Sequence, residues 1–427
     1  MPERVDVAVI GAGFTGLIAA RDLQERGLRV RVLESRDRIG GRTLSRRFPG
    51  ANRVVELGGA WFHADTQHPI VEECARYGIR TAPAEGDATP RWFLGGELRD
   101  AFPVAADDRA SLDAVTAAIA RAADRLPDAT IDELRAHDVP IDEWLSPLHP
   151  TPWVRELIYA KTSTSGGAAP DEHPMLAILQ LVAQGVNAPT LTGGARHSFV
   201  DGAGALAAAI AAELQDAIRF NAPVTAIRQD DGLITVETAA GDVTAPTCVL
   251  TVPINTVGQI AFEPPLEPER IVALRQGNAC LVTKVGMLAR GVPTGLSGTG
   301  WGTPFCSVSV EATVGDAQLV VAFALRGAID PDDLSALEQA LRVYAPEARV
   351  LAAEHHDWAG DPWARGGWMT EPPGWATDGT LDLLARRHGR VLLAGADVAP
   401  AFAGWIAGAI VSGRAAASMV ARDFVLV

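Results

Sequence analysis

Cysteine and tyrosine are scarce in this sequence, with four and three residues among 427. The four cysteines, Cys74, Cys248, Cys280 and Cys306, lie far apart and show no spacing typical of metal ligands. The sequence therefore favours neither a disulfide framework nor a zinc site, and no metal is predicted. We expect the four thiols to be small residues of the core.

Basic clusters and long hydrophobic runs are also missing. The chain has 37 basic and 52 acidic residues, and its arginines are scattered, so nucleic acid is not predicted as a partner. The longest apolar stretch near the C-terminus, residues 401–412, is too short to span a bilayer. No basic segment with a cleavage site marks a signal peptide at the start. The prediction is a soluble, cytoplasmic protein without a membrane partner.

A glycine-rich turn near the start carries the first functional signal. An apolar run over residues 5–10 is followed by Gly11, Gly13 and Gly16, then by apolar residues at helical spacing, and a second predicted strand ends at Glu34. The first glycine makes the tight turn, the second lets the backbone approach a pyrophosphate, and the third lets helix and strand pack closely. The acidic residue would accept hydrogen bonds from ribose hydroxyls. This pattern predicts dinucleotide binding at a helix N-terminus.

The rest of the chain alternates between helical and strand patterns. Residues 69–190 contain alanine-rich and acid-rich segments at helical spacing, which predict an inserted helical region. Residues 224–227 and 233–238 flank an Asp-Asp-Gly turn and read as a β-hairpin. Apolar runs between residues 279 and 325 predict a second sheet, and the run over 391–394 predicts a late buried strand.

Further motifs decide which dinucleotide is bound, because the glycine fingerprint serves both NAD and FAD. The sequence RIGGRT lies at residues 38–43, ELGGAWFH at 56–63 and VTKV at 282–285, and AGAD at 394–397 precedes AGWIAGA at 403–409. In this order the motifs resemble the flavin-containing amine oxidase superfamily, which includes monoamine, polyamine and L-amino acid oxidases. The resemblance runs from end to end of the chain and implies bound FAD.

The resemblance also implies the fold. We expect an α/β protein with a Rossmann-like FAD-binding domain of the glutathione-reductase type and an interleaved α+β substrate domain. The FAD-binding domain would be discontinuous, with residues 1–68, 191–268 and 385–427. The substrate-binding domain would take residues 69–190 and 269–384.

The cofactor contacts follow from the same motifs. Paired glycines leave the backbone open to a flat ring or a phosphate, and Arg42 could pair with pyrophosphate charge. Ordinary turn glycines with a surface arginine, and a turn or helix-cap role for Asp397, are the structural alternatives. Monoamine oxidases attach their flavin through a cysteine in the segment matching residues 366–373, which has none here, so FAD is predicted to be non-covalent. The predicted contacts, besides the glycine fingerprint and Glu34, are Arg36, Gly41, Arg42, Gly58, Gly59, Ala60, Trp61, Val224, Asp397 and Ile406.

Three residues are predicted to carry chemistry. In the family a lysine on the strand matching Lys284 holds a water beside the flavin, whereas lysine is also common at sheet edges. Trp405 stands where many amine oxidases place one wall of an aromatic cage, and Trp368 or Met369 would stand opposite. Tryptophans that merely fill the core are the alternative.

The predicted reaction is FAD-dependent oxidation of a small amine, with hydride transfer from the carbon–nitrogen bond, imine hydrolysis, and reduction of O2 to H2O2. The sequence leaves open an L-amino acid oxidase, which would need an arginine for the carboxylate, and a desaturase. Arg196 and His197 precede the predicted helix at Ala205 and could face the substrate channel. The sequence also leaves open a dehydrogenase that uses another electron acceptor, and a non-catalytic flavin-binding protein. The predicted partners are the amine and O2, and a homodimer is left open.

Overall fold

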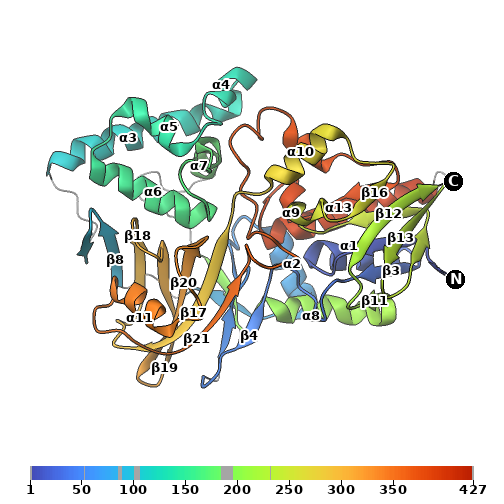
Figure 1. The fold of residues 1–427 in the computed structure, drawn as a ribbon, viewed down its shortest axis with the longest axis horizontal. Coiled ribbons are helices and arrows are strands. Elements are labelled where there is room, and N and C mark those ends of the chain that lie inside the picture. Colours follow the sequence, from blue (N-terminus) through green and yellow to red (C-terminus); the bar gives the residue numbers. More distant parts are fainter. Residues whose placement is uncertain are drawn as a thin grey trace.

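The computed structural model describes residues 2–51, 53–84, 89–100, 106–183, 196–230 and 232–425. Two regions lie side by side, as Figure 1 shows. The region that holds both termini contains a parallel sheet with its helices, and the other contains a larger sheet below a group of helices. The predicted α/β class is therefore confirmed as a mixed fold with parallel and antiparallel sheets.

A five-stranded parallel sheet forms the centre of the first region. Its order is β11 (Ile218–Arg219), β3 (Val30–Leu33), β2 (Val7–Ile10), β15 (Thr247–Leu250) and β22 (Val391–Leu393). Every residue of β2, β15 and β22 is buried, as is typical of parallel strands covered on both faces. The sheet joins strands from the start, middle and end of the chain, so no single segment of sequence can form it alone.

Helices cover one face of the parallel sheet and bury a shared apolar core. They are α1 (Phe14–Gln24), α2 (His68–Tyr77), α8 (Ala203–Leu214) and α13 (Ile406–Val425). Small residues allow close packing of α1 on α13, since a Cβ added at Gly413 would lie 2.6 Å from the Thr15 carbonyl oxygen. Helix α2 contributes Ile70 and Cys74 to this core, although it begins the stretch of sequence that reads as a helical insertion.

A second five-stranded sheet packs against the parallel sheet. Its order is β1 (Glu3–Arg4), β14 (Val243–Ala245), β13 (Leu233–Thr238), β12 (Val224–Asp230) and β16 (Ala261–Glu263). The predicted hairpin corresponds to the antiparallel pair β12 and β13, and Asp231 of its turn lies outside the described residues. A second apolar core lies between the two sheets and extends to α9 (Ile254–Val257), α10 (Pro268–Gln276) and α12 (Thr380–Ala385).

The other region is built on a seven-stranded sheet. Its order is β21 (Arg349–Asp357), β17 (Val282–Arg290), β20 (Ala317–Leu325), β19 (Ser307–Val314), β18 (Leu296–Gly300), β8 (Thr89–Leu94) and β9 (Glu97–Arg99). Strands β18 and β8 pair in parallel, and the other neighbours are antiparallel. Helix α11 (Leu334–Arg342) covers one face, and the opposite face turns toward the first region.

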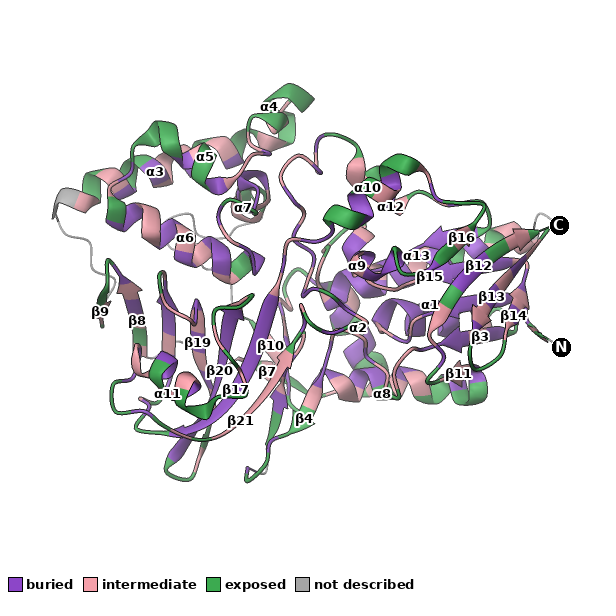
Figure 2. Ribbon diagram, in the orientation of Figure 1, coloured by how far each residue is buried: buried purple, intermediate pink, exposed green. Residues whose placement is uncertain are grey.

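Strands β8 and β9 depart from the sequence expectation, because they lie inside the stretch predicted as a helical insertion. Alternating burial along β8 places Trp92 and Leu94 against the helices, which stabilises a strand in this position. The helices themselves are α3 (Ala106–Arg125), α4 (Ile131–Arg135), α5 (Ile141–Leu145), α6 (Pro152–Gly166) and α7 (Met175–Ala183). Figure 2 shows that the buried residues of α6 and α7 face inward, whereas α4 is exposed over most of its surface.

Short strands connect the two regions. They are β4 (Ser45–Arg47), β5 (Val54–Glu56), β6 (Trp61–Phe62), β7 (Thr81–Pro83) and β10 (His197–Phe199). Strand β10 pairs with both β6 and β7, which brings Arg196 and His197 beside the segment that follows Gly59. Among the helices that the structure describes, none combines the length and apolar character needed to cross a membrane.

Candidate functional site

The glycine fingerprint forms a compact turn between β2 and α1. Gly11 adopts a φ of +101°, which favours glycine, and a side chain at Gly16 would overlap with the Gly11 carbonyl oxygen. Thr251, which follows β15, closes the turn by donating from its hydroxyl to the Ile10 carbonyl at 2.7 Å. Sequence reasoning missed Thr251, whose only signal was its position one residue after a buried strand.

The open side of this turn lies at Gly13 and Gly41. Gly13 caps α1, no side chain satisfies the first amides of the helix, and no acidic residue occupies its first turn. A Cβ added at Gly13 would meet only the Gly41 Cα, 3.8 Å away, and one added at Gly41 would lie 3.1 Å from the Gly13 Cα. Free N–H groups at a glycine-lined helix N-terminus fit a pyrophosphate. The described residues therefore provide a cradle of the kind a dinucleotide needs.

Glu34 lies at the end of β3 with its carboxylate buried. Its two oxygens accept hydrogen bonds from the backbone N–H groups of Ala12, at 2.7 Å, and Arg36, at 2.9 Å. Glu34 also accepts at its own carbonyl from Ala222, two residues before Val224 and β12. The structure thus brings together Gly11, Glu34, Arg36 and the start of β12, as a binding site for an adenosine end would require.

Arg36 is engaged by the other region of the molecule. Its guanidinium pairs with Asp361 at 2.6 Å, and His356 hydrogen-bonds the same carboxylate at 2.7 Å. Burial would raise the pKa of Asp361, but the hydrogen bonds from His356 and Arg36 outweigh it and hold this pKa well below its usual range. The Arg36 side chain therefore joins the two regions, a role the sequence did not suggest.

Arg42 and Asp397 form an ion pair. Arg42 Nη2 lies 2.6 Å from Asp397 Oδ1, and Arg42 Nη1 donates to the Gly367 carbonyl at 2.7 Å. The second oxygen of Asp397 accepts from the Ile254 N–H at 3.0 Å, at the start of α9. Both oxygens of the buried Asp397 carboxylate thus already have partners. Any ribityl hydroxyl would use the remaining lone pairs of Asp397.

The segment Gly58-Gly59-Ala60 lies between this arginine and α13. A side chain at Gly58 would overlap with the Arg42 carbonyl oxygen, whereas Gly59 is exposed, and a Cβ there would stand 3.6 Å from Ile406 Cγ1. Ile406 is the first residue of α13, which has no acidic residue in its first turn. The N-terminus of α13 and the Gly59 backbone therefore lie close together. The positive end of the helix dipole could stabilise the electron-rich edge of a flat ring bound there.

Lys284 is buried on β17, an interior strand of the seven-stranded sheet. Strand β17 lies between β21 and β20, so Lys284 does not guard a sheet edge. Its Nζ donates to the Gly58 carbonyl at 2.9 Å and lies 4.5 Å from the Trp61 ring centroid. Burial lowers the pKa of Lys284 to about 8, although the charges of Glu311 and Glu56 oppose the shift. A buried, partly desolvated cation thus stands beside the glycine segment of the first region.

Aromatic rings surround this lysine. Phe323 faces Lys284 directly across the β17–β20 pair, and its ring lies 6.0 Å from Trp61 and 5.8 Å from Trp368. Sequence reasoning missed Phe323, although its alternating position on a predicted strand could have indicated that it shares a face with other inward residues. Trp61, Phe323 and Trp368 form a continuous aromatic wall.

Trp405 contacts His63, with ring centroids 5.5 Å apart. Met369, the alternative to Trp368, is buried in the core between the two five-stranded sheets, and Gly404 packs against its backbone. The Trp368 ring instead remains partly accessible and donates from Nε1 to the Ser165 carbonyl at 2.9 Å. Of these two residues, only Trp368 presents its side chain to the aromatic wall around Lys284.

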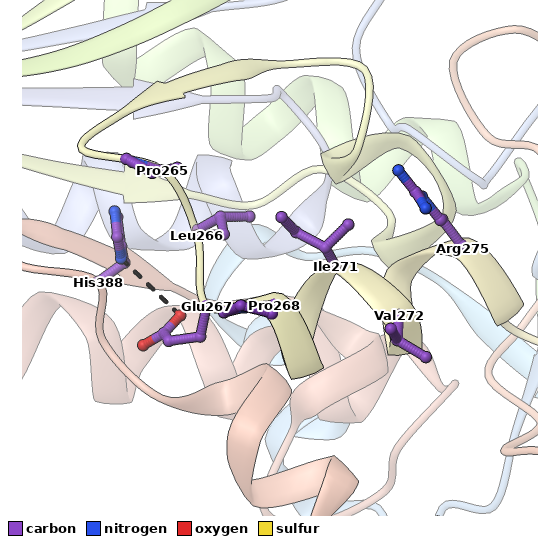
Figure 3. Close-up of a pocket in the computed structure, with 8 residues that line it drawn as sticks. All are labelled: Pro265, Leu266, Glu267, Pro268, Ile271, Val272, Arg275 and His388. Carbon is purple, nitrogen blue, oxygen red and sulfur yellow. Dashed lines mark ion pairs between the residues drawn. The ribbon is translucent and has the colours of Figure 1, made fainter.

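A groove elsewhere on the surface does not belong to this site. Figure 3 shows it between the loop before α10 and His388, with a volume of about 640 Å³. Pro265, Leu266, Ile271 and Val272 give it an apolar character. None of the residues predicted to bind cofactor or substrate lines this groove, so the groove is not part of the candidate site around Lys284.

Comparison with known proteins identifies the family. Residues 14–421 match the family described as flavin containing amine oxidoreductase, and the chain belongs to it. It is 31% identical to an (S)-6-hydroxynicotine oxidase of Paenarthrobacter nicotinovorans, over 97% of this chain and 99% of that protein. It is 30% identical to a pseudooxynicotine dehydrogenase of a Pseudomonas species, over 97% and 86%. The structure of a cyclohexylamine oxidase from Brevibacterium oxydans matches with a TM-score of 0.84 at 22% identity, covering 98% and 99%.

These findings confirm the predicted enzyme class. The protein is an amine-acting oxidoreductase with a flavin cofactor, and the predicted FAD-dependent oxidation of amines is supported by family and relatives alike.

Proposed function

We propose that the parallel sheet is a Rossmann-like domain that binds FAD without a covalent bond. The open backbone at Gly13 and Gly41, the uncapped α1 and the buried Glu34 support this assignment. The segment 366–373 contains no cysteine that could attach a flavin. The discontinuous division at residues 68, 190, 268 and 384 remains part of the same proposal, as does a cytoplasmic location.

The proposed reaction is oxidation of a small amine to an imine, with O2 reduced to H2O2. When bound, the flavin accepts the hydride from the carbon next to the amine nitrogen. The observation that carries the proposal is the buried Lys284, which reaches from the interior strand β17 to Gly58, a predicted cofactor contact. A cation held in a dry site stabilises negative charge that develops nearby far better than it would in water.

The chain supplies orientation and a water-poor pocket around this cation. Trp61, Phe323 and Trp368 offer aromatic faces and edges that bind a neutral amine and exclude water. Trp405 would form the opposing wall next to His63. The two most similar relatives reported above are named for nicotine derivatives, which favours an amine attached to a ring or a short apolar chain as substrate.

One observation favours a second candidate, an L-amino acid as substrate. The Arg196 guanidinium lies 4.9 Å from the Trp61 ring centroid, so a cation that could bind a carboxylate stands near the aromatic wall. Arg196 is exposed, however, and its charge opposes protonation of Lys284. An amine without a carboxylate is therefore the preferred substrate. The molecular mass of the protein in solution tests whether it forms a homodimer.

The test is anaerobic mixing of purified, flavin-loaded protein with nicotine-like amines, alkylamines, diamines and L-amino acids. Bleaching of the visible flavin absorption by an amine, with colour and peroxide returning on aeration, is the expected result. Bleaching followed by slow recovery without peroxide would identify a dehydrogenase. No bleaching across the panel would contradict the proposed activity.

A further inference from the structure

The segment that carries Trp368 has no regular secondary structure, and its position is set by isolated backbone hydrogen bonds, such as that from the Gly367 N–H to the Cys280 carbonyl at 2.8 Å, together with side-chain contacts. Gly366 to Thr370 cross the boundary between β17, helix α6 and the cofactor loop. The Gly367 carbonyl accepts from Arg42, and the Thr370 hydroxyl donates to the Gly166 carbonyl at 2.6 Å. These contacts hold the two ends of the segment and leave the Trp368 peptide between them.

One buried side chain, that of Asn278, holds this central peptide. Asn278 Nδ2 donates to the Trp368 carbonyl at 2.7 Å. Its Oδ1 accepts from the N–H groups of Thr370 and Cys280, each at 2.9 Å. The amide is 3% exposed, and the three partners determine its orientation, because only oxygen can accept two N–H groups while nitrogen donates to a carbonyl.

Asn278 is itself held in place. Its N–H donates to Asn255 Oδ1 at 2.6 Å, and Asn255 Nδ2 donates to the Arg365 carbonyl at 2.7 Å. A fixed amide with every polar atom satisfied loses little entropy when it binds its partners. The Asn278 amide therefore ties the Trp368 backbone to the residues just before β17, which begins four residues after Asn278 and carries Lys284.

We propose that Asn278 is a positioning residue that sets the distance between the Trp368 wall and Lys284, and so determines which amines fit. This inference rests on the proposed function, in which Trp368 lines the substrate site. Asn278 makes its hydrogen bonds to the backbone of Trp368, Thr370 and Cys280, so it acts on the Trp368 ring through the backbone that carries it.

The test compares Asn278→Asp with the wild-type holoenzyme in anaerobic flavin reduction. The substitution keeps the acceptor for Thr370 and Cys280 but replaces the donor to the Trp368 carbonyl by an oxygen. We expect the Kd of the best amine to rise on the order of tenfold, as for loss of one buried hydrogen bond, while the limiting reduction rate changes less. The defect should shrink at low pH, where a protonated carboxyl can donate again.

A matched control is Thr377→Val, which removes another buried hydrogen bond, from Thr377 Oγ1 to Asp138 at 2.9 Å, without touching Trp368. It should lower the unfolding temperature comparably and leave the Kd of the amine unchanged. A pH-independent defect in Asn278→Asp, or an equal change of Kd in Thr377→Val, would show that only stability had been altered and would overturn the proposal.

The Trp368→Ala variant separates the positioning role of Asn278 from the proposal that Trp368 lines the substrate site. If Asn278 acts through Trp368, then Asn278→Asp has no further effect on the Kd in the Trp368→Ala protein, because the positioned ring is gone. Equal effects in both backgrounds would overturn the positioning role. An unchanged Kd in Trp368→Ala alone would instead show that Trp368 is not a wall of the substrate site, which would overturn the role of Asn278 but leave the proposed oxidation of amines, tested by flavin bleaching, intact.

Discussion

The two regions of the molecule reach function by different physical means. Around the parallel sheet, the arrangement depends on backbone: Gly16 leaves space for the Gly11 carbonyl, and Gly13 faces Gly41 with no side chain between them. Around the seven-stranded sheet, it depends on side chains that meet across strands, such as Lys284 and Phe323. Backbone constraints tolerate almost no substitution, whereas side-chain constraints can be changed one at a time.

This difference predicts where mutations act. Changes in the glycine turn should abolish cofactor binding altogether, because nothing can relax around a backbone overlap. Changes near Lys284 should leave the cofactor bound and alter single rate or binding constants. The four predictions below test that contrast in order of decreasing effect.

The largest effect is expected for Gly16→Ala. Its Cβ would overlap with the Gly11 carbonyl oxygen, and the cost should exceed about 3 kcal/mol, enough to prevent flavin binding or folding. The control is Gly258→Ala, since a Cβ there meets nothing within 4 Å. Flavin content of the purified proteins, from visible absorption, measures the outcome. A fully loaded Gly16→Ala protein would show that the turn is not tightly packed.

Lys284→Met should keep its flavin but slow the reaction of the reduced enzyme with O2 about 100-fold, because a preorganised cation is lost. Lys161→Met is the matched control, as its Nζ also lies 4.5 Å from a tryptophan ring, that of Trp92, on the helical side. Stopped-flow reoxidation of both variants gives the rates. Equal rates in Lys284→Met and wild type would remove Lys284 from the chemistry.

Gly367→Ala tests a glycine near Lys284 whose constraint comes from a neighbouring side chain and not from backbone. Its Cβ would lie 2.6 Å from Cys280 Sγ, and the expected loss of stability is about 1–3 kcal/mol. Removing the sulfur in Gly367→Ala/Cys280→Ala should recover part of that loss. Thermal unfolding of both single variants and the double variant provides the measurement, and additive losses would contradict a direct clash.

The smallest effect is a pH dependence. With the pKa of Lys284 lowered to about 8, the ammonium group is lost as pH rises through that value. The advantage of wild type over Lys284→Met in reoxidation should therefore decline toward one between pH 7 and 10. A ratio that stays constant over this range would mean that Lys284 keeps one protonation state throughout.

Much of the cofactor side was predictable because its signals are local. The spacing of Gly11, Gly13, Gly16 and Glu34 implies a strand, a turn and a helix in register, and the structure has this strand and helix, with the Glu34 carboxylate hydrogen-bonded to Ala12 in the turn. The partners of Arg36 and Arg42 were not predictable. Asp361 and Asp397 lie more than 300 residues away, and only folding shows that they neutralise these arginines.

The sequence by itself determined the enzyme class, the flavin and the candidate lysine, since these depend on short motifs whose spacing reflects backbone geometry. Tertiary structure alone decided that β17 is an interior strand, that Phe323 faces Lys284, and that Trp368 rather than Met369 joins the aromatic wall. The physical reason is that register and sheet order arise from contacts between segments far apart in the chain, which no local pattern encodes.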